Sequence, residues 1–491
     1  MARKRGGAHR RVRSPPGRMP AIAGQLRRRR HWVSQGIWAI MDQGFFAVSS
    51  LVINVLLARW LPQRDYGAFV VAFSVVLLMG TVHTAVLGEP MHVFGPSRYR
   101  DRAGAYIRQL IPLHFILTIG MSSILLLVLG VLSLFNRPLA TTSTLAAVAI
   151  SAPGILFLWL MRRACYIESR PRLAAAAGLV FVLLIPAGLL VMTNATTLTA
   201  ATGLVIVGVA SLLVGGGLWR QLTGRRSAAT VPIPISDITR SHWSYGRWAV
   251  GSGLLAWVPG NAVVVALPLW HTLDDAATFR VATMLMLPVQ NVQTALAALI
   301  LPALVRARLS GRLRASARLA RLLFLGLSIL YAPIVVVFGS QITQLLFGAQ
   351  YRIHGATLWL LAAIPLATAA SVVSGTVLRA LERPDRVLWT YVAATAVTCL
   401  IGLPLVAGFG VDGALTALLL SAATTAILGT WADRRLIGTG PTHGAAPPVR
   451  TDSSDRPSRG RYGSYRSNHR DAGTLGVGTG QMPASPSDPV A

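Results

Sequence analysis

The sequence is dominated by apolar runs of roughly twenty residues, separated by short segments rich in arginine. A helix needs about 20 apolar residues to cross the hydrocarbon core of a bilayer. Hydrophobic residues make up 53% of the 491 residues and charged residues only 13%, about half the charged share of a typical soluble protein. These patterns predict an all-α integral membrane protein.

Twelve runs meet the length requirement, six on each side of a polar segment near the middle of the chain. The predicted spans are residues 33–58, 66–88, 110–135, 143–161, 173–193, 199–219, 246–270, 277–304, 319–340, 357–379, 387–408 and 411–432. The two sets define an N-lobe (33–219) and a C-lobe (246–436), joined by a cytoplasmic linker (220–245). The basic N-terminus (1–32) and the polar tail (437–491) are expected to be disordered and cytoplasmic.

The net charge of +30 would suggest nucleic-acid binding in a soluble protein. Here the arginines lie between and beyond the apolar runs, as the positive-inside rule requires, so we expect no nucleic-acid partner. With the N-terminus inside, twenty-two arginines in the connections or at the adjoining span ends fall on the predicted cytoplasmic side and five on the other. This bias supports twelve spans in a bacterial inner membrane, with both termini cytoplasmic.

The two halves are related by an internal repeat. Residues 34–72 align without a gap to residues 244–282, and twelve of the 39 positions are identical, including Trp38/Trp248 and Trp60/Trp270. Six spans per copy is an even number, so both copies enter the membrane in the same direction. Transporters built from such parallel repeats have a central cavity between their two lobes. Rocking of the lobes opens this cavity alternately to the two sides of the membrane.

Several polar side chains fall inside the first predicted span. We regard three of them as candidates for lining a cavity: Asp42, Gln43 and Asn54. Polar and ionisable groups within membranes are rare and usually face a cavity or a partner. Asp42 is either a cation or proton coupling site, a contact to a polar headgroup, or one half of an ion pair with an arginine. The sequence leaves these alternatives open.

The second copy has its own polar candidates. Arg280, Gln290 and Thr294 lie along one helical stripe of the predicted span 277–304, with Asn291 at its edge. Arginine and glutamine suit phosphate oxygens and sugar hydroxyls, although hydrogen bonding between helices is the alternative explanation.

Two further residues complete the candidate set. Asn261 follows Pro259 and Gly260, a pair expected to kink or break its helix. Arg59 ends the first span, where it serves as a headgroup anchor or attracts an anionic headgroup.

No catalytic signature accompanies these residues. The sequence contains no phosphate-binding P-loop, no Gly-x-Ser-x-Gly and no His-Glu-x-x-His motif. We therefore expect neither an enzyme nor a bound metal or cofactor. The two cysteines, Cys165 and Cys399, lie in separate elements and predict no disulfide.

The first hairpin carries a family resemblance. Residues 55–70 contain Ala58, Arg59, Leu61, Tyr66 and Gly67 in the pattern Ala-Arg-x-Leu-x-x-x-x-Tyr-Gly. This run resembles the Wzx-like polysaccharide flippases of the multidrug/oligosaccharidyl-lipid/polysaccharide exporter superfamily. The resemblance implies translocation of an undecaprenyl-diphosphate-linked oligosaccharide to the outer leaflet, for capsule or exopolysaccharide assembly. It also implies membrane lipids, a polysaccharide polymerase and glycosyltransferases as partners.

Two other functions stay open at this point. A drug or organic-cation extruder of the same fold is favoured by Asp42, because exporting a cation calls for a buried acid. A non-transporting scaffold of a polysaccharide synthase is the third hypothesis.

Overall fold

A computed structural model describes residues 19–135, 141–195, 198–223, 233–353 and 355–438. The first half contains α1 (Met19–Trp60), α2 (Gln63–His83), a π-helical turn (Thr84–Gly88), α3 (Glu89–Ser97), a 3₁₀ turn (Arg100–Arg102), α4 (Ala103–Leu134), α5 (Thr142–Ile167), α6 (Pro171–Ala195) and α7 (Ala200–Thr223). The second half contains α8 (Ile235–Trp270), α9 (Leu273–Met284), α10 (Leu287–Leu309), α11 (Leu313–Phe347), α12 (Gly355–Ala380), α13 (Pro384–Val397), a π-helical turn (Thr398–Gly402) and α14 (Leu403–Gly438). The described residues are thus almost entirely helical, as predicted.

Local chemistry explains where several helices begin and end. The Thr272 hydroxyl and the Asp275 carboxylate form a capping box that starts α9. Gly348 follows α11 with φ 106°, a conformation that glycine adopts without a steric penalty. Pro384 occupies the first turn of α13, where its missing N–H costs no helical hydrogen bond.

Eleven helical stretches among the described residues are long and apolar enough to cross a membrane. The last of them, residues 384–437, contains Gly410 with φ 55° and ψ −125°, where the chain turns sharply. His271 at the end of α8 donates to the carbonyls of Val406 and Ala407 beside this turn. The turn falls between the predicted spans 387–408 and 411–432, so the stretch contains two crossings and the predicted total of twelve is retained.

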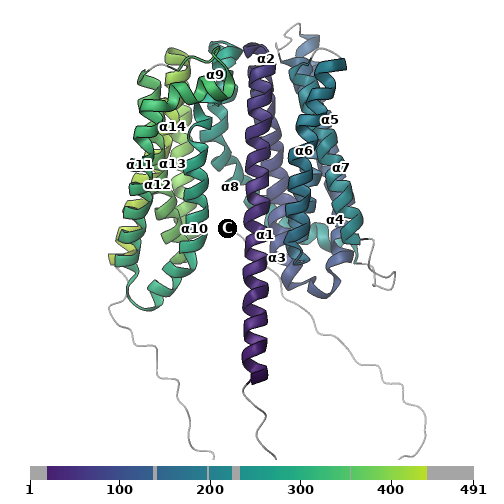
Figure 1. Ribbon diagram of the computed structural model, residues 1–491, viewed down its shortest axis with the longest axis vertical. Coiled ribbons are helices and arrows are strands. Elements are labelled where there is room, and N and C mark those ends of the chain that lie inside the picture. The colour runs from purple at the N-terminus through teal and green to yellow at the C-terminus, as the bar shows by residue number, and fades with distance from the viewer. Residues whose placement is uncertain (1–18, 136–140, 196–197, 224–232, 354, 439–491) are drawn as a thin grey trace, which may run out of the picture. The chain divides into compact units, whose positions relative to one another are not determined.

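The helices form two lobes. In the N-lobe (α1–α7), α1 packs along α6, and α5 packs against α4 and α7. In the C-lobe (α8–α14), α12 packs against α10, α11 and α14 (Figure 1). Helix α8 contacts both lobes, because it packs on α9, α13 and α14 and also on α2, α3 and the π-helical turn of the N-lobe.

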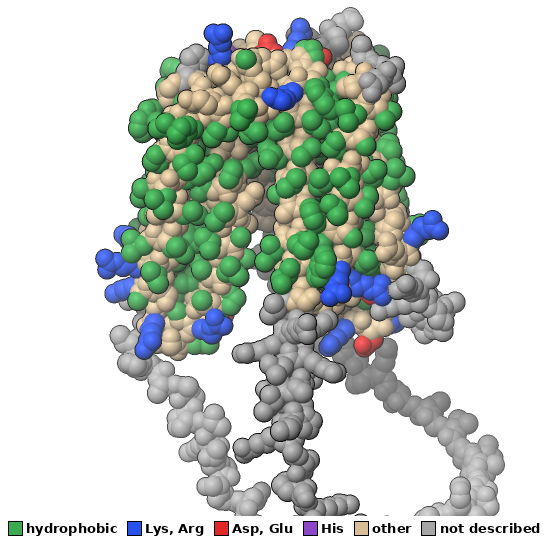
Figure 2. Space-filling model, in the orientation of Figure 1, with side chains coloured by type: hydrophobic (Ala, Val, Ile, Leu, Met, Phe, Trp, Pro, Cys, Tyr) green, Lys and Arg blue, Asp and Glu red, His purple; other side chains and the backbone are tan. Residues whose placement is uncertain are grey.

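The lobes are joined at one end and apart at the other. We call the end where α1 begins the basic end and the end where α1 passes into α2 the distal end. The main cluster of buried apolar residues includes Tyr66, Phe279 and Tyr351, so it continues across both lobes near the distal end. Toward the basic end the C-lobe has a separate cluster around Leu304 and Phe324. Figure 2 shows the hollow between the lobes there, and arginines along the same end.

The structure differs from the sequence prediction at two breaks. The predicted span 277–304 is divided into α9 and α10, because the helix is interrupted at residues 285–286 ahead of Pro288. Helix α8 instead runs unbroken through Pro259 and Gly260, where a kink or break was expected.

The predicted segment boundaries also differ from the helix ends. Helix α1 begins at Met19, within the predicted N-terminal segment 1–32, and α8 begins at Ile235, within the predicted linker 220–245. In α1 the segment ahead of the apolar run contains Gln25 and the arginines at 27–30, which are good helix formers, so this helix begins before the apolar run. Residues 1–18 and 439–491 lie outside the described part of the chain.

Candidate functional site

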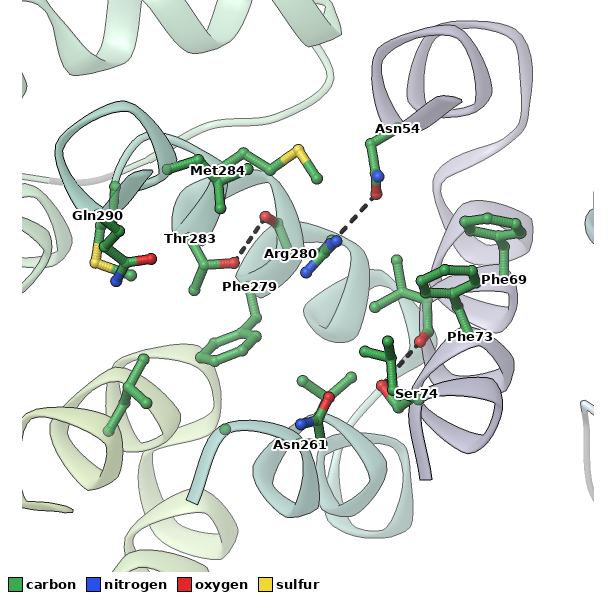
Figure 3. Close-up of a pocket in the computed structure, with 17 residues that line it drawn as sticks. Asn54, Phe69, Phe73, Ser74, Asn261, Phe279, Arg280, Thr283, Met284 and Gln290 are labelled. Carbon is green, nitrogen blue, oxygen red and sulfur yellow. Dashed lines mark hydrogen bonds between the residues drawn. The ribbon is translucent and has the colours of Figure 1, made fainter. Parts of the chain in front are cut away.

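A cavity of about 220 Å³ lies between the two lobes, at the height where α9 passes into α10. The N-lobe contributes residues of α1 and α2, and the C-lobe contributes residues of α8, α9, α10 and α14. Its polar lining residues are Asn54, Ser74, Asn261, Arg280, Thr283 and Gln290 (Figure 3). The cavity thus brings together four of the residues predicted from sequence: Asn54, Asn261, Arg280 and Gln290.

The cavity lining follows the internal repeat. Six pairs of lining residues are 210 positions apart, which is the offset between the two copies. The pairs are Asn54/Val264, Phe69/Phe279, Val70/Arg280, Phe73/Thr283, Ser74/Met284 and Leu77/Leu287. Equivalent surfaces of both copies therefore face the same space. Only the Phe69/Phe279 and Leu77/Leu287 pairs are identical, and the other four pairs differ, so equivalent positions of the two copies carry different side chains.

Arg280 and Asn54 connect the lobes across this cavity. Arg280 Nε donates to Asn54 Oδ1 at 3.2 Å, and Tyr66 OH donates to the same oxygen at 2.8 Å. Asn54 Nδ2 donates to the carbonyl of Ser50, which fixes the orientation of the amide. The Asn54 oxygen therefore accepts from both lobes, and the Arg280 guanidinium lies beside both Asn54 and Tyr66.

The charge on the described residues that line the cavity is positive, and it comes from Arg280. Arg280 is partly buried, and none of its contacts in the described part of the chain is an ion pair. No aspartate or glutamate is among the described residues that line the cavity. Removing a guanidinium from water is costly unless an anion accompanies it. This arrangement suits an anionic ligand and disfavours a cationic one.

Asp42 lies outside this cavity, inside the N-lobe. Arg162 of α5 forms an ion pair with its carboxylate, with Nη2–Oδ1 at 2.9 Å, and Tyr166 OH donates to Oδ2 at 2.6 Å. The Phe46 ring lies 4.2 Å from the guanidinium carbon. The structure therefore places Asp42 in the ion pair that was one of its sequence alternatives.

The other predicted residues take separate positions. Gln43 is exposed on α1. Asn291 lines a second, largely apolar cavity of about 280 Å³ between α1, α10 and α11. Thr294 donates to the Gln290 carbonyl of its own helix. Arg59 is at the distal end, where Nη2 donates to the Leu345 carbonyl.

The hairpin motif closes the distal end. Gln350 Nε2 and Tyr351 OH both donate to the Ala58 carbonyl, at 2.7 Å and 3.3 Å. Burial raises the pKa of the Tyr351 phenol, so it remains a hydrogen-bond donor to higher pH than an exposed tyrosine. A Cβ at Gly67 would lie 1.8 Å from the Leu273 carbonyl oxygen, so only glycine allows α2 and α9 to approach this closely. The motif residues thus hold the two lobes together.

Sequence reasoning missed part of the site. Ser74, Phe69 and Phe279 line the cavity but were not candidates, although the identity of the two phenylalanines across the repeat was a usable signal. It also missed a buried histidine pair in the N-lobe, in which His83 Nε2 and His114 Nδ1 are 2.9 Å apart. No group of three metal-ligating side chains occurs within the described residues.

Comparisons with known proteins agree on the fold. No protein-family profile and no curated protein matches the sequence. Among solved structures, a multidrug resistance MATE family transporter of the MOP superfamily in its inward-facing conformation has a TM-score of 0.65 and 14% identity, and the match covers 82% of this chain and 98% of that chain.

Two further structures extend this comparison. Lipid II flippase MurJ in an inward closed conformation gives a TM-score of 0.63 at 10% identity over 81% of this chain and 87% of that chain. A MOP superfamily transporter from Pyrococcus furiosus, described as having a binding pocket of reverse polarity that suggests a different function, gives 0.54 at 12% identity over 83% and 95%. The chain therefore has the helical fold shared by MATE transporters and the MurJ flippase.

Proposed function

We propose that this protein flips an undecaprenyl-diphosphate-linked oligosaccharide from the cytoplasmic to the outer leaflet of the inner membrane, for capsule or exopolysaccharide assembly. The observation that carries the proposal is Arg280, a partly buried guanidinium in the central cavity, where none of the described lining residues is a carboxylate. A diphosphate supplies the missing anion, and arginine binds phosphate oxygens through paired N–H donors.

The polar neighbours of Arg280 suit the rest of such a headgroup. Asn261, Thr283 and Gln290 present amide and hydroxyl groups on the cavity wall (Figure 3). Sugar hydroxyls both donate and accept hydrogen bonds, as these side chains do. The aromatic rings of Phe69, Phe73 and Phe279 provide flat apolar surfaces beside them.

The second cavity suits the lipid part. It is lined mainly by aliphatic side chains of α1, α10 and α11, and it shares Met284 and Leu287 with the central cavity. A headgroup beside Arg280 would therefore have an apolar route for its prenyl chain between α1 and the C-lobe. The prenyl chain can remain in the apolar phase while only the headgroup passes between the lobes.

A drug or organic-cation extruder is the second candidate, favoured by the fold shared with MATE transporters. Its expected acid, Asp42, is paired with Arg162 inside the N-lobe and does not line the central cavity. The charge of the cavity therefore favours the anionic substrate. A scaffold of a polysaccharide synthase, working with a polymerase and glycosyltransferases, is the third candidate.

The test is complementation of a gene deletion, with surface polysaccharide and cytoplasmic-leaflet lipid-linked oligosaccharide measured together. We expect the deletion to lose polymer and accumulate the lipid-linked precursor. The wild-type gene should restore export, whereas R280Q should not and R280K should restore part of it. The matched control is R352Q, which removes an exposed arginine near the distal end.

The same strains separate the candidates. Unchanged polysaccharide in the deletion strain, together with increased sensitivity to cationic dyes, would establish the extruder instead. Full export by R280Q in a strain that needs the protein would support the scaffold.

A further inference from the structure

A separate basic pocket lies at the basic end of the C-lobe. Arg314, Arg318 and Arg321 of α11 and Arg434 of α14 line it, together with Leu322 and Ile437. The three α11 arginines are spaced at i, i+4 and i+7, so they lie on one face of the helix. Its volume is about 480 Å³, and it shares no lining residue with the central cavity.

Only one of the four guanidinium groups is neutralised. Arg321 forms an ion pair with the buried carboxylate of Asp433 on α14, which also fixes α11 against α14. Arg314, Arg318 and Arg434 form no ion pair within the described residues, and no acidic residue lines the pocket. Three uncompensated positive charges therefore converge on one concave surface.

The pocket is continuous with an apolar helix face. Arg314, Arg318, Leu322 and Ile329 follow one stripe along α11. Leu322 and Ile329 are 60% and 59% exposed, on a helix long and apolar enough to span the membrane. If the arginines hold the charged group of a ligand, the part of the ligand next to that group would lie against an aliphatic surface within the bilayer.

We propose that this pocket binds the headgroup of an anionic phospholipid from the leaflet at the basic end, with the acyl chains along α11. Phosphate oxygens match the arginine donors, and Leu322 and Ile329 match the acyl chains. Three free guanidinium groups favour a headgroup with two phosphates over a headgroup with one.

The chain's own tail is a poorer occupant on the grounds of charge. Residues 440–491 contain six arginines and four aspartates. A segment with a net positive charge is repelled by an uncompensated cluster of arginines. A free phosphate ion would satisfy the arginines but would leave the apolar stripe without a partner. The experiment must therefore distinguish the phosphate of a lipid from a free phosphate ion.

The experiment is native mass spectrometry of the full chain in non-ionic detergent, titrated with diphosphatidylglycerol or with phosphatidylcholine. We expect one tightly bound diphosphatidylglycerol per wild-type chain and at least tenfold weaker binding to R314Q/R318Q/R434Q. The matched control R220Q/R240Q/R247Q removes three exposed arginines that do not line the pocket, and should bind within twofold of wild type. Equal binding by the two triple variants would overturn the proposal.

A second variant distinguishes lipid from free phosphate. L322Q should weaken the binding of diphosphatidylglycerol and leave the binding of inorganic pyrophosphate unchanged. If L322Q has no effect on the lipid and pyrophosphate displaces it at equal concentration, the pocket is a phosphate site and the lipid proposal is wrong. Thermal unfolding in the same detergent checks folding, and R318Q alone replaces the triple variant if that variant does not fold.

Discussion

Asp42 of α1 and Arg162 of α5 form an ion pair in which the Asp42 side chain is fully buried and the Arg162 side chain is 10% exposed. The carboxylate accepts from both Arg162 and Tyr166, so all its partners belong to the N-lobe. The pair therefore ties α1 to α5 independently of the contacts between the lobes. The pair matters for the stability of the fold, because removing either member leaves the charge of the other buried and without a counter-charge.

We predict that Asp42→Asn lowers the free energy of unfolding by about 3–5 kcal/mol, because it leaves the Arg162 guanidinium without its counter-charge. The measurement is thermal or denaturant unfolding in detergent. The double variant D42N/R162M should recover much of the loss, since no unpaired buried charge remains. Wild-type stability in D42N together with lost transport would instead indicate a coupling role for the carboxylate.

The repeat allows the cavity cation to be moved between lobes. Val70 occupies the position in the first copy that Arg280 occupies in the second, and both line the central cavity. We expect R280V to abolish polysaccharide export and V70R/R280V to restore part of it, because the cation then faces the same space from α2. V70R alone should retain export. Equal failure of R280V and the double variant would show that Arg280 acts through its bond to Asn54 rather than through its charge.

Gly67 should control which end of the protein is open. A methyl group there would lie 1.8 Å from the Leu273 carbonyl oxygen, so Gly67→Ala must push α2 away from α9. We expect longer distances between spin labels at positions 64 and 352, on the two lobes, in a background in which the exposed Cys399 is replaced by serine. Gly251→Ala is the control, because no atom lies within 4 Å of a Cβ at that glycine. Unchanged distances in G67A would argue against backbone contact at this position.

The histidine pair should behave as one structural unit. His114 Nε2 faces the Pro153 carbonyl at 3.1 Å and must carry its proton, so His114 Nδ1 accepts from His83 Nε2–H. His114→Phe removes an acceptor and a donor at once and should cost about 1–3 kcal/mol for each buried group left unpaired. In a double-mutant cycle with His83→Leu, the two losses should not add, because the variants share one hydrogen bond. Additive losses would contradict the bond.

Much of the architecture was predictable, because the free energy of transferring side chains from water to lipid decides which segments can cross a membrane. Apolar length predicted the number of crossings, including the turn between 408 and 411 that the structure places at Gly410. The helix break was not predictable. Pro259 and Gly260 lie within a continuous α8, whereas the helix is interrupted before Pro288. A proline inside a membrane helix is tolerated where its surroundings satisfy the freed backbone groups, and sequence does not show those surroundings.

The candidate site was predictable only in part, because the rotation of a helix about its axis depends on what it packs against. Arg280, Gln290 and Thr294 fall on one stripe of an ideal helix, but the interruption at 285–286 separates α9 from α10. Gln290 then faces the central cavity, whereas Asn291 faces the apolar cavity beside α1. Sequence spacing alone could not assign these neighbours to different spaces.

The sequence by itself determined that this is an all-helical membrane protein of two repeated halves, because hydropathy and charge act on each segment independently of its neighbours. Only the tertiary structure decided that Asp42 meets Arg162 at a separation of 120 residues, while Arg280 meets no carboxylate of the residues that the structure describes. Many arginines could have paired with the single acid of α1. The packing of α1 and α5 within the N-lobe selected one of them, and the packing of α9 against α1 placed Arg280 beside the neutral Asn54 instead of an acid.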